Sequence, residues 1–423
     1  MTLCQFSFTN FKSFKDEATL DLFAERISEH EDSLIIDPID NEKFLPVISI
    51  YGPNGGGKSN VLKAFSCLSS RVLLPVIALK HEASEEAGAD IEKIQELERN
   101  YTLEGTKHFK FDEACKNKPI SFDVLFRVDA TEYKYQLSIL HSSITEENLY
   151  AVDLETGKAQ IVFERSGKEH FLGSYFGGIA IGNIKSSMPL LSHLSINYEY
   201  KIIDQVILWL LSCRILNYNN AYSDKTVVSL NSEKDEKLFF EMLAEAGIDI
   251  TSIRTEEDAE GEITGIYTTH CLEDGSCEEL SFGDESSGTR KLFGLFPYLL
   301  AALNKGSLII ADEMDAKLHP KLLHYVIELF TNPKTNKNGA QLIFTSHDMY
   351  TMKPAVFRRD EIWFSALRRD NSSKLYSLVE FRKENGAKVR NDETYDKQYI
   401  EGRYGADPYL KSIIGWGECA DEQ

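Results

Sequence analysis

A glycine-rich segment at residues 52–59 has the residue types and the spacing of a phosphate-binding loop. It satisfies the pattern G-x-x-x-x-G-K-[ST] and is followed by Asn60; its residues are Gly52, Pro53, Asn54, Gly55, Gly56, Gly57, Lys58 and Ser59. Glycines let backbone N–H groups turn inward around a β-phosphate, while Lys58 supplies positive charge and Ser59 offers a hydroxyl to Mg²⁺. A strand expected at 47–51 and a helix expected at 60–79 provide the context that this loop requires. An ordinary glycine turn would not explain the Lys-Ser pair.

Two adjacent acids close an apolar run at residues 307–313. Asp312 would complete the oxygen ligands of Mg²⁺, and Glu313 would orient or deprotonate an attacking water. Read alone, an apolar strand that ends in Asp-Glu is a common boundary before a helix. Together with the loop at 52–59, it predicts a site that binds ATP with Mg²⁺ and hydrolyses it. A long stretch of chain separates the two motifs, so we expect a large insertion between them.

Further polar residues fall at the ends of expected elements. The segment 286–289 opens an apolar helix, where free N–H groups and the helix dipole attract anions, although most serines at such a place are helix caps. It consists of Ser286, Ser287, Gly288 and Thr289. Asp315 follows Glu313 closely. The strand expected at 341–345 runs into His347, and pairing with the 307–313 strand would place His347 beside Glu313.

The composition excludes several classes of protein. The 423 residues carry a formal net charge of −21, which does not suit a coat for nucleic acid, because backbone phosphates attract Lys and Arg. No uninterrupted apolar run approaches the roughly 20 residues of a membrane-spanning helix, and the N-terminus does not resemble a signal peptide. Seven scattered cysteines predict reduced thiols and a cytoplasmic protein. They are Cys4, Cys67, Cys115, Cys213, Cys271, Cys277 and Cys419.

The hydrophobic pattern predicts a mixed α/β protein. Alternation predicts strands at 4–8, 19–23, 120–128 and 133–140, and a β-hairpin at 253–280 that turns at 273–276. Helical spacing predicts helices at 202–215 and 236–246, and a solvated, acidic helix at 82–104. From residue 280 onward the order is loop, helix, strand, helix, strand.

We expect a discontinuous core with one large insertion. The core would comprise residues 1–75 and 265–350. Residues 76–264 would form the insertion, with an acidic helix, a β-subdomain and a helical region. Residues 351–423 would form a C-terminal α/β segment that serves as a partner or assembly surface, through arginine-bearing stretches at 358–369 and 382–403. A nucleic-acid contact there is a further hypothesis.

In this order, the segments resemble the ABC-type ATPases of the SMC and RecF kind. They are most similar to the small AAA/ABC ATPases of bacterial abortive-infection and PARIS-type phage-defence systems, relatives of the OLD ATPase domain. Other matching residues are Asn10-Phe11-Lys12-Ser13-Phe14, Tyr133-Lys134-Tyr135, Glu164-Arg165, the run from Asp312 to Pro320, and Gly402-Arg403-Tyr404-Gly405-Ala406.

The resemblance implies an ABC-type P-loop NTPase head with a large mixed β and helical insertion between the phosphate loop and the signature segment. It also implies two heads that meet head to tail, so that residues 52–59 of one chain face residues 286–289 of the other across ATP. His347 would then be the switch histidine on the γ-phosphate, Asp315 would belong to the loop that joins the two sites, and Lys12 and Ser13 would lie near the nucleotide.

Two features depart from the relatives. Ser287 stands where transporter heads carry a glycine of Ser-Gly-Gly-Gln. The glutamine that ligates Mg²⁺ in the relatives has four candidates here: Gln95, Gln136, Gln160 and Gln205.

Two weaker signals favour a structural role. Arg165 and His170 match the R-x-x-x-x-H spacing of some ribonucleases, but Ser166-Gly167-Lys168 predicts a turn between strands where those enzymes have a helix. His270, Cys271 and Cys277 could suggest a metal, but they flank the expected hairpin turn without a second pair.

The sequence therefore predicts an ATP-binding and ATP-hydrolysing ABC-type ATPase. As a sensor, switch or scaffold in anti-phage defence, it would self-associate and control a separate effector protein encoded nearby, without a membrane partner. The alternative is a RecF/SMC-like ATPase of DNA repair or recombination that binds DNA across an ATP-closed dimer. A transporter subunit fits less well, because of the long insertion and the altered signature.

Overall fold

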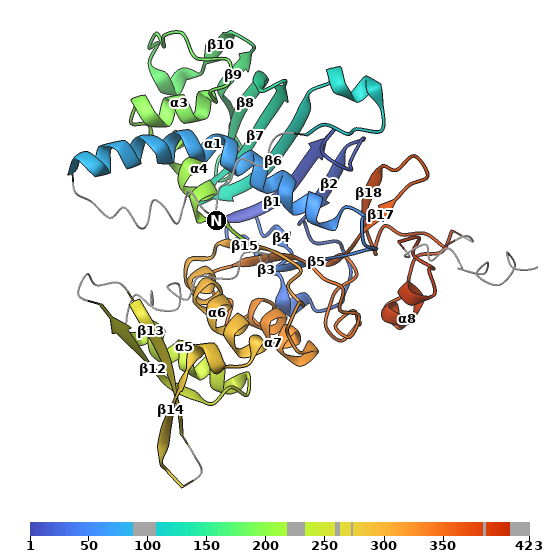
Figure 1. Cartoon of the computed structure of the whole chain (residues 1–423). Coiled ribbons are helices and arrows are strands. Elements are labelled where there is room, and N and C mark those ends of the chain that lie inside the picture. Colours follow the sequence, from blue (N-terminus) through green and yellow to red (C-terminus); the bar gives the residue numbers. More distant parts are fainter. Residues whose placement is uncertain (88–106, 218–232, 259–262, 272–273, 384–385, 407–423) are drawn as a thin grey trace, which may run out of the picture.

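The computed structural model describes residues 1–87, 107–217, 233–258, 263–271, 274–383 and 386–406, and two sheets form its frame (Figure 1). The larger sheet is antiparallel. Its order is β10 (Glu169–Leu172), β9 (Ala159–Ser166), β8 (Ser143–Asp153), β7 (Thr131–Leu140), β6 (Ile120–Val128), β1 (Thr2–Thr9) and β2 (Ala18–Asp21). This sheet confirms the strands that alternation predicts at 4–8, 19–23, 120–128 and 133–140.

The second sheet carries the ends of the predicted motifs. Its order is β11 (Arg214–Asn217), β15 (Leu308–Asp312), β16 (Gln341–Thr345), β5 (Val47–Tyr51), β17 (Ile362–Leu367) and β18 (Ser373–Ser377). Neighbouring strands are parallel except β17 and β18. Because the strands run in one direction, the residues that follow β5, β15 and β16 meet at one edge of the sheet.

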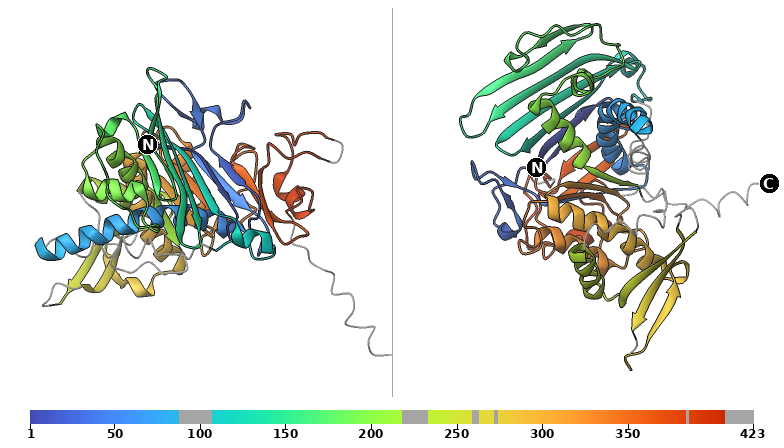
Figure 2. Two further views of the ribbon diagram at one scale, coloured as in Figure 1. Left: turned by 90° about the horizontal axis from the view of Figure 1, so that it is seen from above. Right: turned by 90° about the vertical axis from the view of Figure 1, so that its left-hand side faces the viewer.

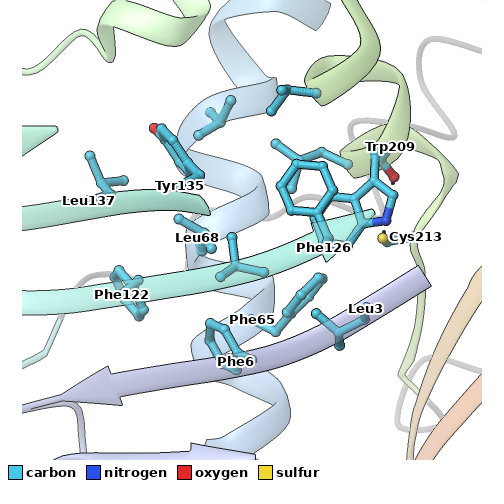
Figure 3. Packing of buried hydrophobic residues seen from close by; sticks show 14 of the residues in the cluster. Leu3, Phe6, Phe65, Leu68, Phe122, Phe126, Tyr135, Leu137, Trp209 and Cys213 are labelled. Atoms are coloured by element: carbon cyan, nitrogen blue, oxygen red, sulfur yellow. Dashed lines mark hydrogen bonds between the residues drawn. The ribbon is translucent and has the colours of Figure 1, made fainter. Parts of the chain in front are cut away.

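One long helix, α1 (Lys58–Ala87), joins the two sheets. Its side chains are buried on several faces, and they share one core with both the antiparallel sheet and the second sheet. Figure 3 shows Phe65 and Leu68 of α1 packed among side chains of β1 and β6. Helix α4 (Lys201–Ser212) closes this core, where Trp209 stacks on Phe126 with a centroid distance of 3.8 Å. Because α1 is enclosed by both sheets and by α4, it must be apolar on more than one side.

The apolar composition of α1 also satisfies the length and hydropathy of a membrane span over residues 58–78, among the residues described. Most of that stretch is buried inside the protein, and Lys63 and Arg71 interrupt it. A core helix commonly has this composition, so the finding is weak evidence for a membrane.

A second core covers the opposite face of the second sheet. Alternate residues of β15 point to the two sides: Ile310 joins the core around α1, whereas Ile309 and Ala311 join the second core. Helices α5 (Glu233–Glu245), α6 (Ser287–Lys305) and α7 (Pro320–Thr331) complete this layer. Helices therefore flank both faces of a mostly parallel sheet, as in other α/β proteins (Figure 2).

Buried polar side chains fix the packing of these layers. The amide of Gln341 accepts from the N–H of Leu3 (2.7 Å) and donates to the carbonyls of Leu3 and Leu45 (both 3.1 Å), which ties β1 to β16. Glu147 of β8 accepts from the N–H groups of Leu190 (2.6 Å) and Leu191 (2.9 Å), which open α3 (Leu190–Asn197). Both links lie away from water, where an unpaired polar group is costly.

Arg165 takes part in the second of these links. Its guanidinium is buried, and one of its nitrogens lies 3.7 Å from a carboxylate oxygen of Glu147. It also donates hydrogen bonds to the carbonyls of Gly167 and Met188. Gly167 turns the chain between β9 and β10, where His170 pairs with Arg165. The turn predicted at Ser166–Lys168 is confirmed, and Arg165 has a structural role.

The region predicted as a hairpin is a sheet of three strands. Strands β12 (Ile250–Glu257), β13 (Ile263–Cys271) and β14 (Cys277–Ser281) form it, and it projects from the rest of the protein (Figure 1). The prediction missed β12 because two strands, β13 and β14, are enough to account for the turn expected at 273–276. Cys271 and Cys277 form a disulfide across that turn, so the prediction that all cysteines are reduced is wrong for this pair. Cys4, Cys67, Cys115 and Cys213 are free and buried.

The second sheet draws on all three parts of the expected division. β11 comes from the expected insertion, and β17 and β18 come from the expected C-terminal segment. This differs from the division at 75, 265 and 350, because pairing within a sheet does not follow order in the chain. Of the acidic helix expected at 82–104, residues 82–87 belong to α1, and the remainder lies outside the described residues.

The arginines expected to form a C-terminal contact surface are partly buried. Arg358 is 0% exposed; its side chain donates to both carboxylate oxygens of Asp360 (2.9 and 2.8 Å) and to the carbonyl of Glu25 (3.0 Å). Arg359 pairs with Glu29 at 2.7 Å. The expectation that residue 358 contacts a partner is therefore wrong, because its charge neutralises a buried carboxylate and joins residues 25–29 to β17.

Replacing Arg358 by Met should destabilise the fold by about 3–5 kcal/mol, because it strands the buried Asp360 carboxylate without its partner. Urea unfolding should measure the loss. Arg390→Met is the matched control, since Arg390 and Asp392 form an exposed pair and the change should cost at most about 1 kcal/mol. A loss at Arg358 no larger than that of the control contradicts the assignment.

Candidate nucleotide site

The glycine-rich loop lies between β5 and α1, at the edge where the parallel strands end. Gly52, Gly55 and Gly57 have φ values of 151°, 78° and 103°, which side-chain-bearing residues rarely adopt. A Cβ on Gly57 would also meet the hydroxyls of Ser373 (2.5 Å) and Ser13 (2.8 Å). The backbone path therefore requires glycine at all three positions, and close packing adds to this requirement at Gly52 and Gly57.

A set of hydroxyl groups holds this loop from outside. Ser365 of β17 donates to the carbonyl of Gly56 at 2.8 Å. Ser13 accepts hydrogen bonds from Asn60 (2.8 Å) and from the hydroxyl of Ser373 (2.9 Å), so that one side chain connects the start of α1 with β18. Ser13, which the resemblance places near the nucleotide, thus touches the loop directly. Lys12 precedes it with φ of 49°.

Lys58 is 6% exposed, and its amine donates to the carbonyls of Gly52 (2.7 Å) and Pro53 (3.2 Å). Burial lowers the pKa of Lys58, while Asp312, Glu313 and Asp315 act in the opposite direction. The amine is bonded to neutral carbonyls inside the loop, so a phosphate anion would stabilise its charged form.

Ser59 and Asp312 are 253 positions apart in the chain, and their side chains are in contact. The Ser59 hydroxyl donates to Asp312 Oδ1 at 3.0 Å, and the Thr345 hydroxyl donates to the same oxygen at 2.6 Å. A hydroxyl beside a carboxylate offers the hard oxygen ligands that Mg²⁺ prefers. Ser59 and Asp312 therefore fit a Mg²⁺ ion that accompanies ATP, and the ion would neutralise charge on the phosphate oxygens.

Glu313 is exposed and has φ of 48°, a left-handed conformation that is uncommon outside glycine. Two contacts hold it there. Its N–H donates to the Thr345 hydroxyl at 2.7 Å, and the amine of Lys291 donates to the carbonyls of Glu313 (3.4 Å), Met314 (2.9 Å) and Ala316. Burial lowers the pKa of Lys291 to about 8. The carboxylate that would activate water thus sits on a backbone fixed from two sides.

Asp315 and His347 meet beside Glu313. The backbone N–H of His347 donates to Asp315 Oδ2 at 3.1 Å, and the imidazole is exposed. Asp315 Oδ1 is buried without a hydrogen-bond partner in the described part of the chain. Pairing of β15 with β16 brings Glu313 and His347 to one edge, as the sequence predicts.

Residues 286–289 open α6 as predicted. Ser286 caps the helix, since its hydroxyl accepts from the N–H of Thr289 at 3.1 Å. Ser286 and Ser287 are exposed. Among the described residues, no hydrogen bond joins this segment to the phosphate loop. Ser286, Ser287, Gly288 and Thr289 therefore stay predictions as nucleotide contacts.

Sequence reasoning missed four residues of this site: Thr345, Lys291, Ser365 and Ser373. Thr345 and Ser373 end or begin strands, so their hydroxyls were indistinguishable from ordinary strand residues. Lys291 follows the signature segment by two positions, but its contact with the loop after Glu313 depends on helix packing.

The Mg²⁺-binding glutamine stays unassigned. Gln136 of β7 donates to Asp123 of β6 (2.7 Å), and Gln205 of α4 accepts from Tyr133 of β7 (2.8 Å). Gln160 lies on β9, and Gln95 lies outside the described residues.

Comparison with protein families agrees with this geometry. The family described as "AAA domain, putative AbiEii toxin, Type IV TA system" matches residues 47–353, which include the phosphate loop, Asp312 and His347. The match covers well over half of the chain, and the chain belongs to this family. The matched region is an AAA domain, and it contains the phosphate-binding loop within an α/β fold. No curated protein matches the sequence significantly.

Solved structures with a similar arrangement include SMC heads. The SMC head domain from Thermotoga maritima has 14% identity and a TM-score of 0.43, over 89% of this chain and 99% of that one. An SmcHead bound to the C-winged helix domain of ScpA has 13% identity and a TM-score of 0.42, over 89% and 97% of the two chains. A Pyrococcus furiosus-derived Smc head domain with an extended coiled coil, bound to the C-terminal domain of ScpA, has 13% identity and a TM-score of 0.40, over 89% and 96%.

Replacing Lys58 by Ala should lower the ATP hydrolysis rate at least about 100-fold and weaken ATP binding, because no other group of the loop supplies the charge. A coupled phosphate-release assay and calorimetry with ATP measure the two effects. The exposed Lys158, changed to Ala, is the control and should leave both unchanged. Near-normal turnover of Lys58→Ala contradicts the phosphate-loop assignment.

Proposed function

We propose that this protein is an ATP-driven switch. Two copies of the chain, each forming one head, would close on ATP and report that state to a separate effector protein. Lys58, Ser59 and Asp312 would bind Mg²⁺–ATP, together with the backbone of residues 52–57 and Asn60. Glu313 would orient or deprotonate the attacking water, and His347 would contact the γ-phosphate.

One observation carries the proposal. A single carboxylate oxygen of Asp312 accepts hydrogen bonds from Ser59, at the start of α1, and from Thr345, at the end of β16; Thr345 also accepts from the N–H of Glu313. The loop that would hold phosphate and the residue that would activate water are therefore connected through two short contacts. A change in the ligands of Asp312 on ATP binding would reach Glu313 directly.

Sharing of the site between two chains follows from the position of the signature segment. Ser286 and Ser287 are exposed at a helix start, where N–H groups favour phosphate, and among the described residues no hydrogen bond joins residues 286–289 to the phosphate loop of the same chain. A head-to-tail pair would bring the phosphate loop of each chain against residues 286–289 of the other. A two-fold axis then creates two identical composite sites.

Mixing two inactive variants tests this sharing. Ser286→Arg places a bulky charge where the γ-phosphate of the partner chain would lie, so it should abolish ATP-driven dimerisation while a lone chain still binds ATP. In a mixed dimer with Lys58→Ala, one composite site has both defects and the other has none. An equal mixture should recover about a quarter of the wild-type hydrolysis rate if the sites act independently.

Ser286→Asn is the control for loss of the helix cap, because Asn also caps helices well. A mixture that stays inactive, although dimers form, contradicts two independent shared sites.

The proposed setting is anti-phage defence. The description of the family names an AbiEii toxin and a Type IV toxin–antitoxin system, which supports a role in bacterial self-limiting responses. Arg165 is held in a structural contact, so the ribonuclease-like spacing offers no nuclease of its own. We therefore assign the destructive step to a second protein encoded nearby, and the cytoplasm as the site of action.

Glu313→Gln should bind ATP normally and hydrolyse it about 100-fold or more slowly, because a neutral amide cannot accept a proton. It should therefore retain the neighbouring protein on co-purification in ATP more strongly than wild type, while Lys58→Ala should lose it. Quantitative pull-down in ATP, ADP and no nucleotide measures this. Equal retention in all three conditions contradicts control by ATP.

A further inference from the structure

We propose that the ATP-closed dimer is held by two oppositely charged surfaces, one beside the phosphate loop and one beside the signature segment of the partner copy. The partner is a second copy of this chain. The inference rests on the proposed function, because it names the surfaces that the shared site brings together.

The first surface, called here the basic surface, consists of three segments: 12–17, 107–118 and 368–374. Nine basic residues lie on it: Lys12, Lys15, Lys107, Lys110, Lys116, Lys118, Arg368, Arg369 and Lys374. Five acids accompany them: Asp16, Glu17, Asp112, Glu113 and Asp370. This excess of positive charge contrasts with a net charge of −21 for the chain.

Printed contacts join these three segments into one surface. The N–H of Lys12 donates to the carbonyl of Lys107 at 2.8 Å, and Lys15 pairs with Asp112 at 2.9 Å. Arg368 pairs with Asp16, and the N–H of Ser373 donates to the carbonyl of Ser13 at 2.7 Å. Asn10 fixes the second segment, since its amide donates to the carbonyls of Cys115 and Lys118 and accepts from Phe109.

The basic surface borders the phosphate loop. Ser13 and Ser373, which connect its first and third segments, are the same two residues whose hydroxyls pack against Gly57. Lys110, Lys116 and Lys118 are exposed, and Phe111 between them is 72% exposed. The surface is therefore both attached to the ATP site and open to a partner.

The second surface, called here the acidic sheet, is the projecting sheet of β12, β13 and β14 (Figure 1). Its described residues carry one arginine, Arg254, against six exposed acids: Glu256, Glu257, Asp258, Asp274, Glu278 and Glu279. Arg254 pairs with Glu256 and Glu279, which leaves a negative surplus.

The acidic sheet is attached to the signature segment. Glu285, which directly precedes Ser286, is buried and accepts from the Thr268 hydroxyl at 2.6 Å. Its carboxylate also bonds to His270 Nε2 at 2.7 Å, so β13 holds the start of the signature from one side. A displacement of the sheet would therefore move Ser286.

A head-to-tail dimer places the surroundings of each phosphate loop against the surroundings of the partner's signature. The basic surface then meets the acidic sheet twice, once on each side of the two-fold axis. Two chains of charge −21 repel each other at long range, so association needs local complementarity of this kind. ATP fills the gap between the two motifs, and the charged surfaces select the correct partner face.

Charge exchange in the full chain tests the inference, with Glu313→Gln present to retain ATP. The first variant carries Lys110→Glu, Lys116→Glu and Lys118→Glu. The second carries Glu257→Lys, Asp258→Lys and Glu278→Lys. The third carries all six changes, and the matched control carries Lys158→Glu, Lys168→Glu and Lys185→Glu, exposed positions away from both surfaces.

Sedimentation in Mg²⁺–ATP measures the dimer dissociation constant. Each three-residue variant should raise the dissociation constant at least about tenfold above that of the parent, which is Glu313→Gln with native charges. The six-residue variant should return to within about threefold of the parent's dissociation constant, because the attraction is restored with exchanged signs. The control should not weaken the dimer. Raising the salt concentration should weaken the parent dimer, since exposed charges are screened.

Other outcomes separate the explanations. Failure of Glu313→Gln with native charges to dimerise in ATP contradicts the proposed function itself. Two outcomes would overturn only the charged surfaces. In the first, the Glu313→Gln dimer forms and neither three-residue variant weakens it; in the second, the six-residue variant dimerises no more tightly than the weaker of the two three-residue variants. If Lys110→Glu, Lys116→Glu and Lys118→Glu abolish binding of a duplex of about 30 base pairs and leave the dimer intact, the basic surface binds nucleic acid instead.

Discussion

The burial of one helix between two sheets is the constraint on which the structure depends. Helix α1 begins with Lys58 and Ser59, and its apolar residues then join the core shared by both sheets. The phosphate loop is therefore anchored at both ends, by β5 and by a helix that cannot shift without opening the larger core. Rigid anchoring matters because electrostatic stabilisation of phosphate depends on donors that are already oriented.

From this anchor, the site is assembled by short contacts between distant segments. Asp312 receives hydrogen bonds from Ser59 and Thr345, and Lys291 of α6 holds the carbonyls that follow Glu313. The second sheet thus collects strands from every region of the chain, including β11 and β17. A chain with so long an insertion can still form one site, because parallel strands need only reach the same edge.

The residues that looked functional in the sequence form two groups, one buried and one exposed. Arg165 and Arg358 are buried and neutralise carboxylates, so their charge serves the fold. Ser286, Glu313 and His347 are exposed at one edge or at a helix start, where a ligand or a second chain can reach them. The cost of an unpaired buried charge explains the first group, since a buried arginine without its carboxylate would be strongly destabilising.

The sequence by itself determined the phosphate loop, the Asp312–Glu313 pair and most strands and helices, because these depend on local spacing and on alternation that a single segment carries. It did not reveal the third strand β12, the Cys271–Cys277 disulfide or the burial of Arg358. Those features depend on which distant segments pair. Only the tertiary structure decided that Thr345 and Lys291 flank Glu313, because hydroxyl and amine groups show their role only once packing has chosen their neighbours.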